Sequence, residues 1–305
     1  MENRTSYEDF QKNLLNTVSQ ELNQQGRYQC ELTQTAKNNV TLTGIVIRQE
    51  GSMTAPVFYL DHAYQQYLQG KPLNQIGQDL ITYYQKIDVP VFEEQDITDY
   101  EKMKDRLRVR LVNKENNKGF YKQGPYRMQP LGAEVLYAEL QRSEEGSLSV
   151  HLTNAIAENW GIPKQELFAA ALEHTQEHNK VSFVPMGDII RELLTDEKVE
   201  EETEGYMYVL TNERREHGAI VTSYPGVLEQ VREQLGGDFY ILPSSTHEVI
   251  ILQKEFGMDP REMRSMVREI NAEMVEPQEI LSNEVYEFQG KTNKVKNCIK
   301  EERER

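Results

Sequence analysis

The sequence contains one motif with the spacing of a zinc enzyme, at residues 174–178. It reads His-Thr-Gln-Glu-His, so on a helix His174 and His178 would lie one turn apart and could bind one zinc ion, with Glu177 polarising a bound water. The motif follows the last apolar residues of its helix and directly precedes Asn179, so its surroundings are polar. No third ligand is singled out by the sequence. We therefore expect a solvated helix end here and no metal.

A second group of residues has the types needed for nucleophilic catalysis. Ser244 and Ser245 precede His247 and Glu248, so an imidazole could activate a serine hydroxyl. The G-x-S-x-G elbow is absent, and the serines follow a proline in a turn between two expected strands, where serine is common. We expect His247 and the serines to be hydrogen-bonded at the mouth of a hairpin. With Tyr224 they form a candidate contact surface, because polar groups and an aromatic ring gather there near strand ends.

The common cofactor signatures are absent from the sequence. It contains no G-x-x-x-x-G-K-[ST] loop, no G-x-G-x-x-G and no C-x-x-C pair, which removes the simplest nucleotide, dinucleotide and structural-zinc interpretations. We therefore expect no cofactor and favour a protein that is not an enzyme. The alternative is a hydrolase, either metal-dependent at His174 and His178 or of the serine–histidine type near Ser244 and His247.

The composition is that of a soluble, acidic protein. The 305 residues include 34 basic and 50 acidic side chains, a net charge of −16, and no apolar run approaches the roughly 18 residues of a membrane helix. Cys30 and Cys298 are the only cysteines, and the first residues lack the basic and apolar regions of a signal peptide. These features favour a reducing cytoplasm and no membrane contact, and the charge opposes nucleic acid on average.

One segment departs from this charge balance. Residues 102–127 hold nine basic and two acidic residues, a net charge of +7, which leaves −23 for the rest of the chain. Its arginines alternate with apolar residues, as in a strand with one buried and one basic face. The simplest interpretation is that the segment pairs with the protein's own acidic excess, within the fold or across a dimer. The alternatives are contact with nucleic acid, whose bases stack on aromatic rings, or with an acidic protein. The contact surface would comprise Arg106, Arg108, Arg110, Tyr121, Tyr126 and Arg127.

The elements expected around these residues are helices and antiparallel strands. Hydrophobic periodicity predicts helices over residues 7–22, 61–68, 73–87, 164–177, 185–194 and 260–274. Hairpins are expected over residues 27–48, 134–152, 206–221 and 239–252. Helix caps are expected at Ser6, at Asp61, at Thr153 and Asn154, and at Thr222 or Ser223. The sequence thus predicts an α+β fold, in which antiparallel sheet built from recurring hairpin-then-helix units is flanked by helices.

The expected domain boundary lies in an acidic, proline-containing stretch at residues 88–99. The expected parts are a helix, hairpin and helix pair over 1–92, a main α+β domain over 93–290 and a loose polar tail over 291–305, where apolar periodicity has ended. Another acidic stretch, 196–204, is expected to be a solvated loop.

Several short stretches together resemble a known family. They are APVFYL at 55–60, RLVN at 110–113, NN at 116–117, LTN at 152–154, YPGVL at 224–228 and FYILPSSTHEVI at 239–250. In this order they resemble an uncharacterised bacterial family of Firmicutes, a domain of unknown function that is distantly similar to the YtpQ-like proteins. The resemblance spans about residues 5 to 275 and implies a bacterial, cytoplasmic setting. It implies no activity, cofactor or catalytic residue, and no histidine pair at the position of His174 and His178.

These observations favour a non-enzymatic binding or interaction protein with a basic contact strand. The basis is that neither catalytic motif has the surroundings that its chemistry requires, whereas the cationic segment stands out against an acidic chain.

Overall fold

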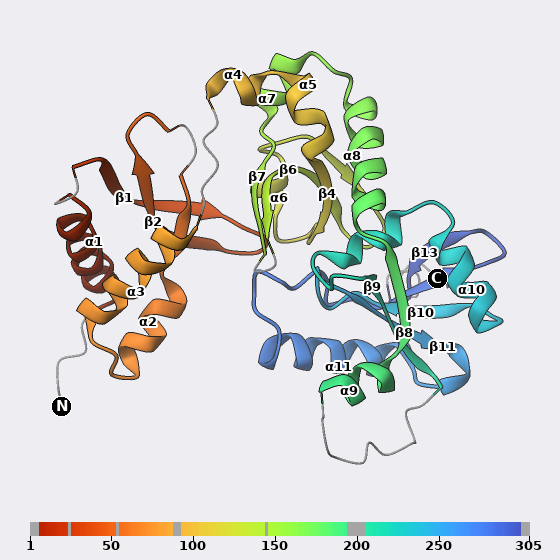
Figure 1. The fold of residues 1–305 in the computed structure, drawn as a ribbon. Coiled ribbons are helices and arrows are strands. Elements are labelled where there is room, and N and C mark those ends of the chain that lie inside the picture. The colour runs from red at the N-terminus through yellow and green to blue at the C-terminus, as the bar shows by residue number, and fades with distance from the viewer. Residues whose placement is uncertain are drawn as a thin grey trace. The chain divides into compact units, whose positions relative to one another are not determined.

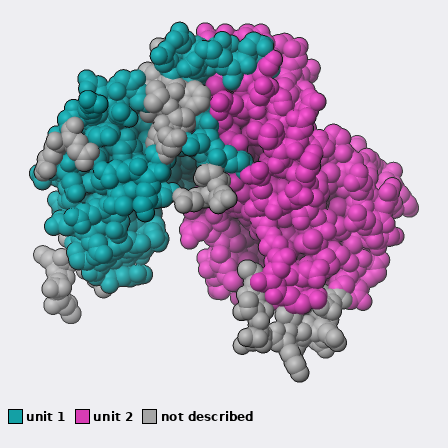
Figure 2. All heavy atoms as spheres, viewed as in Figure 1, with its two compact units in different colours: residues 1–102, 140–148 teal, residues 103–139, 149–305 magenta. Residues whose placement is uncertain are grey.

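The structure is a computed structural model that describes residues 6–23, 26–52, 55–87, 93–143, 146–193 and 205–299. The chain divides into two compact units (Figure 2). Unit 1 comprises Met1–Lys102 and Leu140–Leu148, and unit 2 comprises Met103–Glu139 and Ser149–Arg305. The stretch expected to hold the domain boundary, 88–99, precedes the change of unit at Lys102, and its residues 88–92 lie outside the described part.

Unit 1 combines three main helices with a three-stranded antiparallel sheet of order β1-β2-β3 (Figure 1). Helix α1 contacts both α3 and β1. The main elements are α1 (Tyr7–Asn23), β1 (Tyr28–Ala36), β2 (Thr41–Gln49), β3 (Val57–Tyr59), α2 (Asp61–Leu68) and α3 (Leu73–Lys86), followed by the short helices α4 (Glu94–Thr98) and α5 (Tyr100–Met103). The predicted first hairpin and these three main helices are confirmed.

The periodicity of α1 explains the core of unit 1. Phe10, Leu14, Val18 and Leu22 recur every four residues and are completely buried, because that spacing brings them to one helix face. The hydroxyl of Ser6 accepts a hydrogen bond from the backbone N–H at position 9, so the predicted cap is confirmed.

The smaller sheet, in which β6 is central, lies mostly in unit 2, while residues 140–143 of β6 and 146–148 of β7 belong to unit 1. Strands β4 and β5 pair antiparallel with β6, and β7 pairs with β6 as well, as the predicted hairpin requires. The turn of that hairpin, at 144–145, lies outside the described residues. The elements are η1 (Lys104–Arg106), β4 (Leu107–Val112), α6 (Lys118–Tyr121), β5 (Tyr126–Met128), β6 (Ala133–Ser143), β7 (Gly146–His151), α7 (Asn154–Trp160) and α8 (Lys164–His178).

The second sheet of unit 2 has six antiparallel strands in the order β13-β12-β10-β11-β9-β8 (Figure 1). The predicted hairpin over 239–252 is confirmed as β10 and β11. The elements are β8 (Val181–Pro185), α9 (Met186–Leu193), β9 (Met207–Asn212), η3 (Gly218–Ser223), α10 (Val227–Leu235), β10 (Phe239–Leu242), β11 (Val249–Gln253), η4 (Lys254–Phe256), α11 (Pro260–Glu273), β12 (Tyr286–Gln289) and β13 (Lys294–Asn297).

The hairpin predicted over 206–221 is wrong. Residues 218–223 form the 3-10 helix η3, and β9 pairs with β11 and β8 instead. His217 has a positive φ of 49°, so the chain turns away from β9 at that point. Gly218 then lies so close to the neighbouring chain that a Cβ would stand 2.5 Å from the His247 carbonyl oxygen.

The prediction of a loose tail over residues 291–305 is wrong for part of its length. Lys294–Asn297, inside the tail expected from residue 291, form β13 and pair with β12. The segment is polar because it is an edge strand, where one side of the ladder faces no further strand. Residues 196–204 lie outside the described part.

Three predicted helix caps are also wrong. Leu60 precedes α2 without a side-chain cap, so Asp61 lies inside the helix. Of the two residues expected to cap α7, Thr153 does so, by accepting from the backbone N–H of residue 156, whereas Asn154 is the first residue of the helix. Helix α10 follows Gly226 at a φ of 80°, because a Pro-Gly turn separates it from Thr222 and Ser223.

The α+β class with antiparallel sheets is confirmed by these elements. Among the helices of the described residues, none has both the length and the apolar character needed to cross a membrane.

Candidate functional site

The arginines of β4 do not form an open basic face. Arg108 is only 7% exposed, and its guanidinium lies 3.7 Å from Glu139 and donates to the backbone carbonyl oxygens of Asp105 and Leu107. Arg110 is half-buried and donates to Ser149 across 2.7 Å. Its guanidinium also stacks 4.2 Å from the centre of the Tyr137 ring. The predicted strand with one buried and one basic face is therefore wrong, because this second face is covered too.

The free edge of β4 is covered as well, by helix α8. The backbone N–H of Val109 donates to the Thr175 hydroxyl at 2.9 Å, and that hydroxyl donates in turn to the Ala171 carbonyl. Thr175 is almost completely buried, so this hydrogen bond replaces the partner that a further strand would have supplied.

Arg127 on β5 is held by a completely buried carboxylate. It is the cross-strand partner of Glu134, and two of its nitrogens lie 2.7 and 2.6 Å from one Glu134 oxygen. The other Glu134 oxygen accepts from Gln129 at 2.8 Å. The guanidinium also lies 4.4 Å from the centre of the Phe168 ring. The simplest interpretation of the basic segment, pairing with the protein's own acids, thus applies to Arg108 and Arg127. Arg106, at the end of η1, is half-buried.

A pocket of about 300 Å³ is lined by Tyr126, which directly precedes Arg127 on β5. Tyr126 is the one residue of the predicted basic contact surface in this lining. The buried Tyr121 lies behind that ring, with the two centres 4.8 Å apart. The pocket is formed by the α6–β5 connection, by α7 and by the start of α8. Its lining comprises Lys122, Gly124, Pro125, Tyr126, Asn154, Ala157, Glu158, Gly161, Ile162, Lys164 and Leu167.

Two hydrogen bonds and one close backbone contact hold the α6–β5 connection beside the pocket. Asn154 donates from its side chain to the Lys122 carbonyl and from its backbone to the Gln123 carbonyl, which ties the α6–β5 connection to the start of α7. Gly124 then packs directly on Leu152, where a Cβ would lie 1.9 Å from the carbonyl oxygen. Only glycine allows this close approach.

Two lysines give the pocket its charge. The Lys164 ammonium lies 4.8 Å from the centre of the Tyr126 ring, and Lys122 is an exposed residue of the same lining. Within the described residues neither lysine has a carboxylate partner, and Glu158 is the only acidic residue of the lining. The pocket therefore offers two cations and an aromatic ring to a ligand.

The histidine of the second candidate surface lies in a polar cluster at the strand ends. Nδ1 of His247 accepts from the backbone N–H of His217 at 3.2 Å, so the neutral ring carries its proton on Nε2. That nitrogen lies 3.5 Å from the Glu279 carboxylate. The two histidine rings stack with their centres 5.2 Å apart. Both imidazole nitrogens thus face partners that are not a serine.

The serines of this surface have other partners. The Ser245 hydroxyl accepts from the backbone N–H of His247 at 2.9 Å, and the backbone of Ser244 accepts from Leu281. Burial raises the pKa of the nearby Glu248 carboxyl. Among the described residues no hydrogen bond joins a serine hydroxyl to the imidazole, so His247 is not placed to act as the base of a serine nucleophile.

Tyr224 does not belong to this surface. It is almost completely buried and donates to the carbonyl of Asn179, and burial raises the pKa of its phenol. The expected contact surface of Tyr224, Ser244, Ser245 and His247 is therefore wrong at Tyr224, which lies in the interior of the protein.

The loop before η3 is held by one buried amide. Asn212 is completely buried; its oxygen accepts from the backbone of Arg214 and Glu216, and its nitrogen donates to the Glu216 carbonyl. Arg215 and His217 both have positive φ, a conformation that costs on the order of 1 kcal/mol for a residue with a Cβ. The sequence gives no local signal for this loop.

The H-x-x-E-H motif lies at the end of α8, and its histidines are directed to different partners. His178 Nδ1 lies 2.8 Å from the carbonyl oxygen of His174, and His174 Nε2 lies 3.6 Å from Asp105. No group of three or more histidine, cysteine, aspartate or glutamate residues that could hold a metal occurs in the described part of the chain.

Sequence reasoning missed Asn154 as a pocket residue and Lys164 altogether. Lys164 starts a helix distant in sequence from Lys122, and no motif links the two. The one available signal was that Lys122 and Tyr126 belong to the basic, aromatic segment.

Fold and site together define an α+β protein with antiparallel sheets and a small cationic pocket. Residues 7–290 match the model of a family of unknown function, DUF5688, and the chain belongs to that family. The resemblance is thus confirmed at this level, whereas the bacterial source, the likeness to YtpQ-like proteins and the cytoplasmic location stay predictions. Neither a curated protein nor a solved structure matches the chain.

Proposed function

We propose that this protein is a non-enzymatic binding protein, and that the pocket of Lys122, Tyr126 and Lys164 takes a small anionic ligand. The ligand carries a carboxylate or phosphate group beside a planar, apolar part. The observation that carries the proposal is the convergence of two lysines on one concave, aromatic-lined site, with neither lysine paired to a carboxylate within the described residues.

The size and the charges favour a small ligand over a polyanion. A volume of about 300 Å³ is at the lower end of the range for small-molecule sites. A net charge of −16 repels a long polyanion, and Arg108 and Arg127, which would follow a phosphate backbone, are paired with internal acids. A small anion meets mainly the local field of the two ammonium groups, so it is least affected by that repulsion.

Calorimetric titration of the full chain tests the proposal with three probes: phenyl phosphate, inorganic phosphate and benzyl alcohol. We expect phenyl phosphate to bind most tightly, because it uses both the cations and the Tyr126 ring, and benzyl alcohol least tightly. The double variant Lys122→Gln/Lys164→Gln should weaken phenyl phosphate binding roughly tenfold or more, the loss expected when charge-assisted contacts are removed.

Lys180→Gln is the matched control, because Lys180 is an exposed lysine of the same unit outside the pocket lining. Equal affinity of the double variant and the control variant for phenyl phosphate would contradict the proposal. So would an oligonucleotide or an acidic peptide that binds the double variant as tightly as the original chain.

A further inference from the structure

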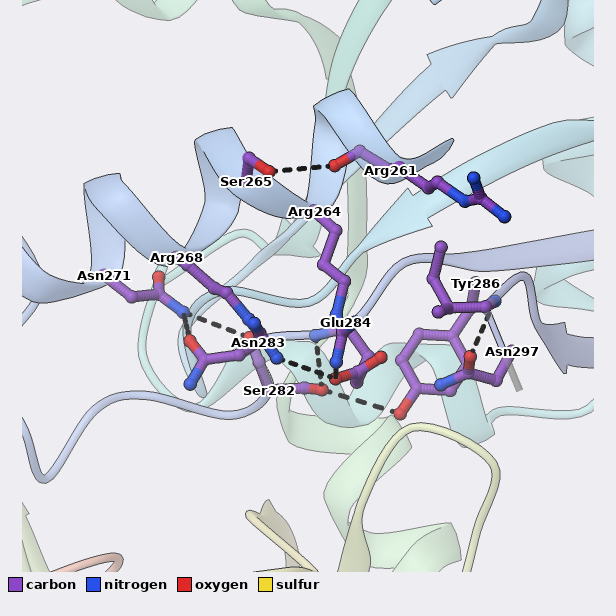
Figure 3. A network of polar contacts seen from close by, with 11 residues as sticks. Arg261, Arg264, Ser265, Arg268, Asn271, Ser282, Asn283, Glu284, Tyr286 and Asn297 are labelled. Atoms are coloured by element: carbon purple, nitrogen blue, oxygen red, sulfur yellow. Dashed lines mark hydrogen bonds and ion pairs between the residues drawn. The ribbon is translucent and has the colours of Figure 1, made fainter. Parts of the chain in front are cut away.

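Polar side chains on one side of helix α11 bind it to the rest of unit 2 (Figure 3). Arg264 and Arg268 both form ion pairs with the nearly buried carboxylate of Glu284. One turn further on, the Asn271 amide donates to the carbonyl of Ser282 and to the side chain of Asn283. These contacts and the buried apolar side chains of the helix fix its rotation about its own axis.

The apolar face of α11 is wider than the part that unit 2 covers. Met263 and Val267 are buried against the six-stranded sheet. Next to them, Met266, Ile270 and Met274 recur every four residues and are 47%, 44% and 80% exposed. The backbone N–H of Met274 still bonds to the Ile270 carbonyl, so Met274 continues the helical spacing. We call Met266, Ile270 and Met274 the α11 stripe.

Unpaired carboxylates border this stripe. Glu262, Glu269 and Glu273 are exposed, and each lies three or four residues from a member of the stripe, so they share its side of the helix. Within the described residues none of the three has an ion-pair or hydrogen-bond partner. The arginines of α11, by contrast, lie on the opposite border, where Arg264 and Arg268 serve Glu284.

We propose that the α11 stripe docks a cationic amphipathic helix of a partner protein. The apolar face of the partner helix would pack on Met266, Ile270 and Met274. Its lysines or arginines would form ion pairs with the carboxylates that border the stripe, Glu262, Glu269 and Glu273. Anchors spaced at i, i+4 and i+8 match the face of a bound helix. Two of the anchors are methionines, whose flexible side chains adapt to apolar partners.

Charge favours a cationic helix over two other occupants of the stripe, a second copy of the chain and an anionic lipid surface. A second copy of the chain would bring three more carboxylates to the same border and a further net charge of −16, so self-association through the stripe is opposed. An anionic lipid surface attracts basic helix borders, and this border is acidic. A cationic helix satisfies the apolar and the acidic part together.

Fluorescence anisotropy tests the proposal by measuring how the full chain binds two labelled 18-residue peptides of leucine and lysine. In one peptide the leucines follow helical spacing, and in the other the same residues are scrambled. We expect the patterned peptide to bind at least roughly tenfold more tightly. Ile270→Ser/Met274→Ser and, separately, Glu269→Lys/Glu273→Lys should each weaken that binding roughly tenfold, because the first removes apolar anchors and the second reverses the border charge.

Matched controls separate the stripe from the general acidity of the chain. Glu173→Lys/Glu177→Lys on α8 makes the same change of net charge at the same spacing on another exposed helix face, and Met128→Ser removes an exposed methionine elsewhere. Neither control should alter the affinity more than about twofold.

Several outcomes would overturn the proposal. One is an equal loss of affinity in the α8 and α11 charge variants, which would assign the binding to diffuse charge. Others are equal binding of the two peptides, a dimer in sedimentation that Ile270→Ser/Met274→Ser dissociates, or binding to anionic vesicles that the same variant abolishes. Thermal unfolding of each variant checks that the fold is retained.

Discussion

Cations from one short stretch of chain end in opposite environments. Arg108 and Arg127 turn inward and meet the carboxylates of Glu139 and Glu134, whereas Lys122, from the same stretch, lies exposed in the lining of the pocket. The difference follows from the elements that carry them. A residue in a paired strand has a fixed cross-strand neighbour, such as Glu134 opposite Arg127, while a loop residue has none.

The chemistry of the side chains agrees with this division. Arginine presents a planar set of donors that suits buried pairs and ring stacking, and Arg110 and Arg127 both stack on aromatic rings. Lysine is a compact, strongly hydrated charge that remains at the surface. A high local density of basic residues in a sequence is therefore not by itself a binding surface. The arginines of the paired strands are used within the fold, whereas Lys122, in a connection, has no carboxylate partner among the described residues.

The largest effect is expected from breaking the most buried pair, with Glu134→Ala. The substitution leaves the Arg127 guanidinium and the Gln129 amide without their acceptor, and Arg127 is only partly able to reach water. We expect the free energy of unfolding to fall by about 3 kcal/mol. Urea denaturation followed by circular dichroism measures it.

Glu158→Ala is the matched control, since Glu158 is exposed and has no partner among the described residues. It should change the free energy of unfolding by no more than about 0.5 kcal/mol. If Glu134→Ala cost as little as this control, the inward-facing arginines would not be held by their carboxylates.

The next effect concerns the connection beside the pocket, through Gly124→Ala. A Cβ would stand 1.9 Å from the Leu152 carbonyl oxygen, so the α6–β5 connection must move away from Leu152. We expect a loss of about 1–3 kcal/mol in the free energy of unfolding. Phenyl phosphate binding should be lost with it, as calorimetry can measure.

Gly119→Ala provides the comparison, because a Cβ there meets nothing within 4 Å. This variant should be as stable as the original chain or slightly more stable, since alanine favours the helical state. If Gly124→Ala retained both stability and phenyl phosphate affinity, the close approach at Leu152 would not shape the pocket.

Much of the fold could be predicted because its elements have local signals. The spacing of Phe10, Leu14 and Val18 predicts α1, and the apolar runs of β10 and β11 predict a hairpin. Strand β13 has no such signal, because an edge strand needs few apolar residues. The 3-10 helix η3 depends on the approach of Gly218 to His247, a tertiary contact that local propensity does not contain.

The candidate site could be predicted only in part, for the same reason. Charge segregation identified the segment that contains Lys122 and Tyr126, but Lys164 reaches the pocket through the packing of α8. The carboxylates that neutralise the arginines are fixed by the β4–β6 and β5–β6 registers, and the sequence contains many other acids that could have served. Spacing predicts which residues share a face, and tertiary packing decides which faces meet.

A smaller effect is expected at the edge of β4, from Thr175→Val. The change keeps the shape of the side chain but removes the acceptor of the Val109 backbone N–H. We expect a loss of about 1–2 kcal/mol in the free energy of unfolding, because the N–H stays buried without a partner. Thr17→Val on α1 is the control: that hydroxyl also bonds to the carbonyl four residues earlier, but on an exposed surface. Equal effects of the two variants would contradict a role of Thr175 in closing the edge.

The smallest effect on stability is expected from Lys122→Gln, and it sharpens the comparison most directly. If this lysine is available to a ligand because no carboxylate within the fold uses it, its removal should change the free energy of unfolding by no more than about 0.5 kcal/mol. Arg110→Gln should cost about 1 kcal/mol, because it loses the ring contact with Tyr137 and the hydrogen bond to Ser149. Urea midpoints of both variants, measured together, give the difference. A loss for Lys122→Gln as large as that for Arg110→Gln would place Lys122 among the internal cations and remove the distinction between strand and loop.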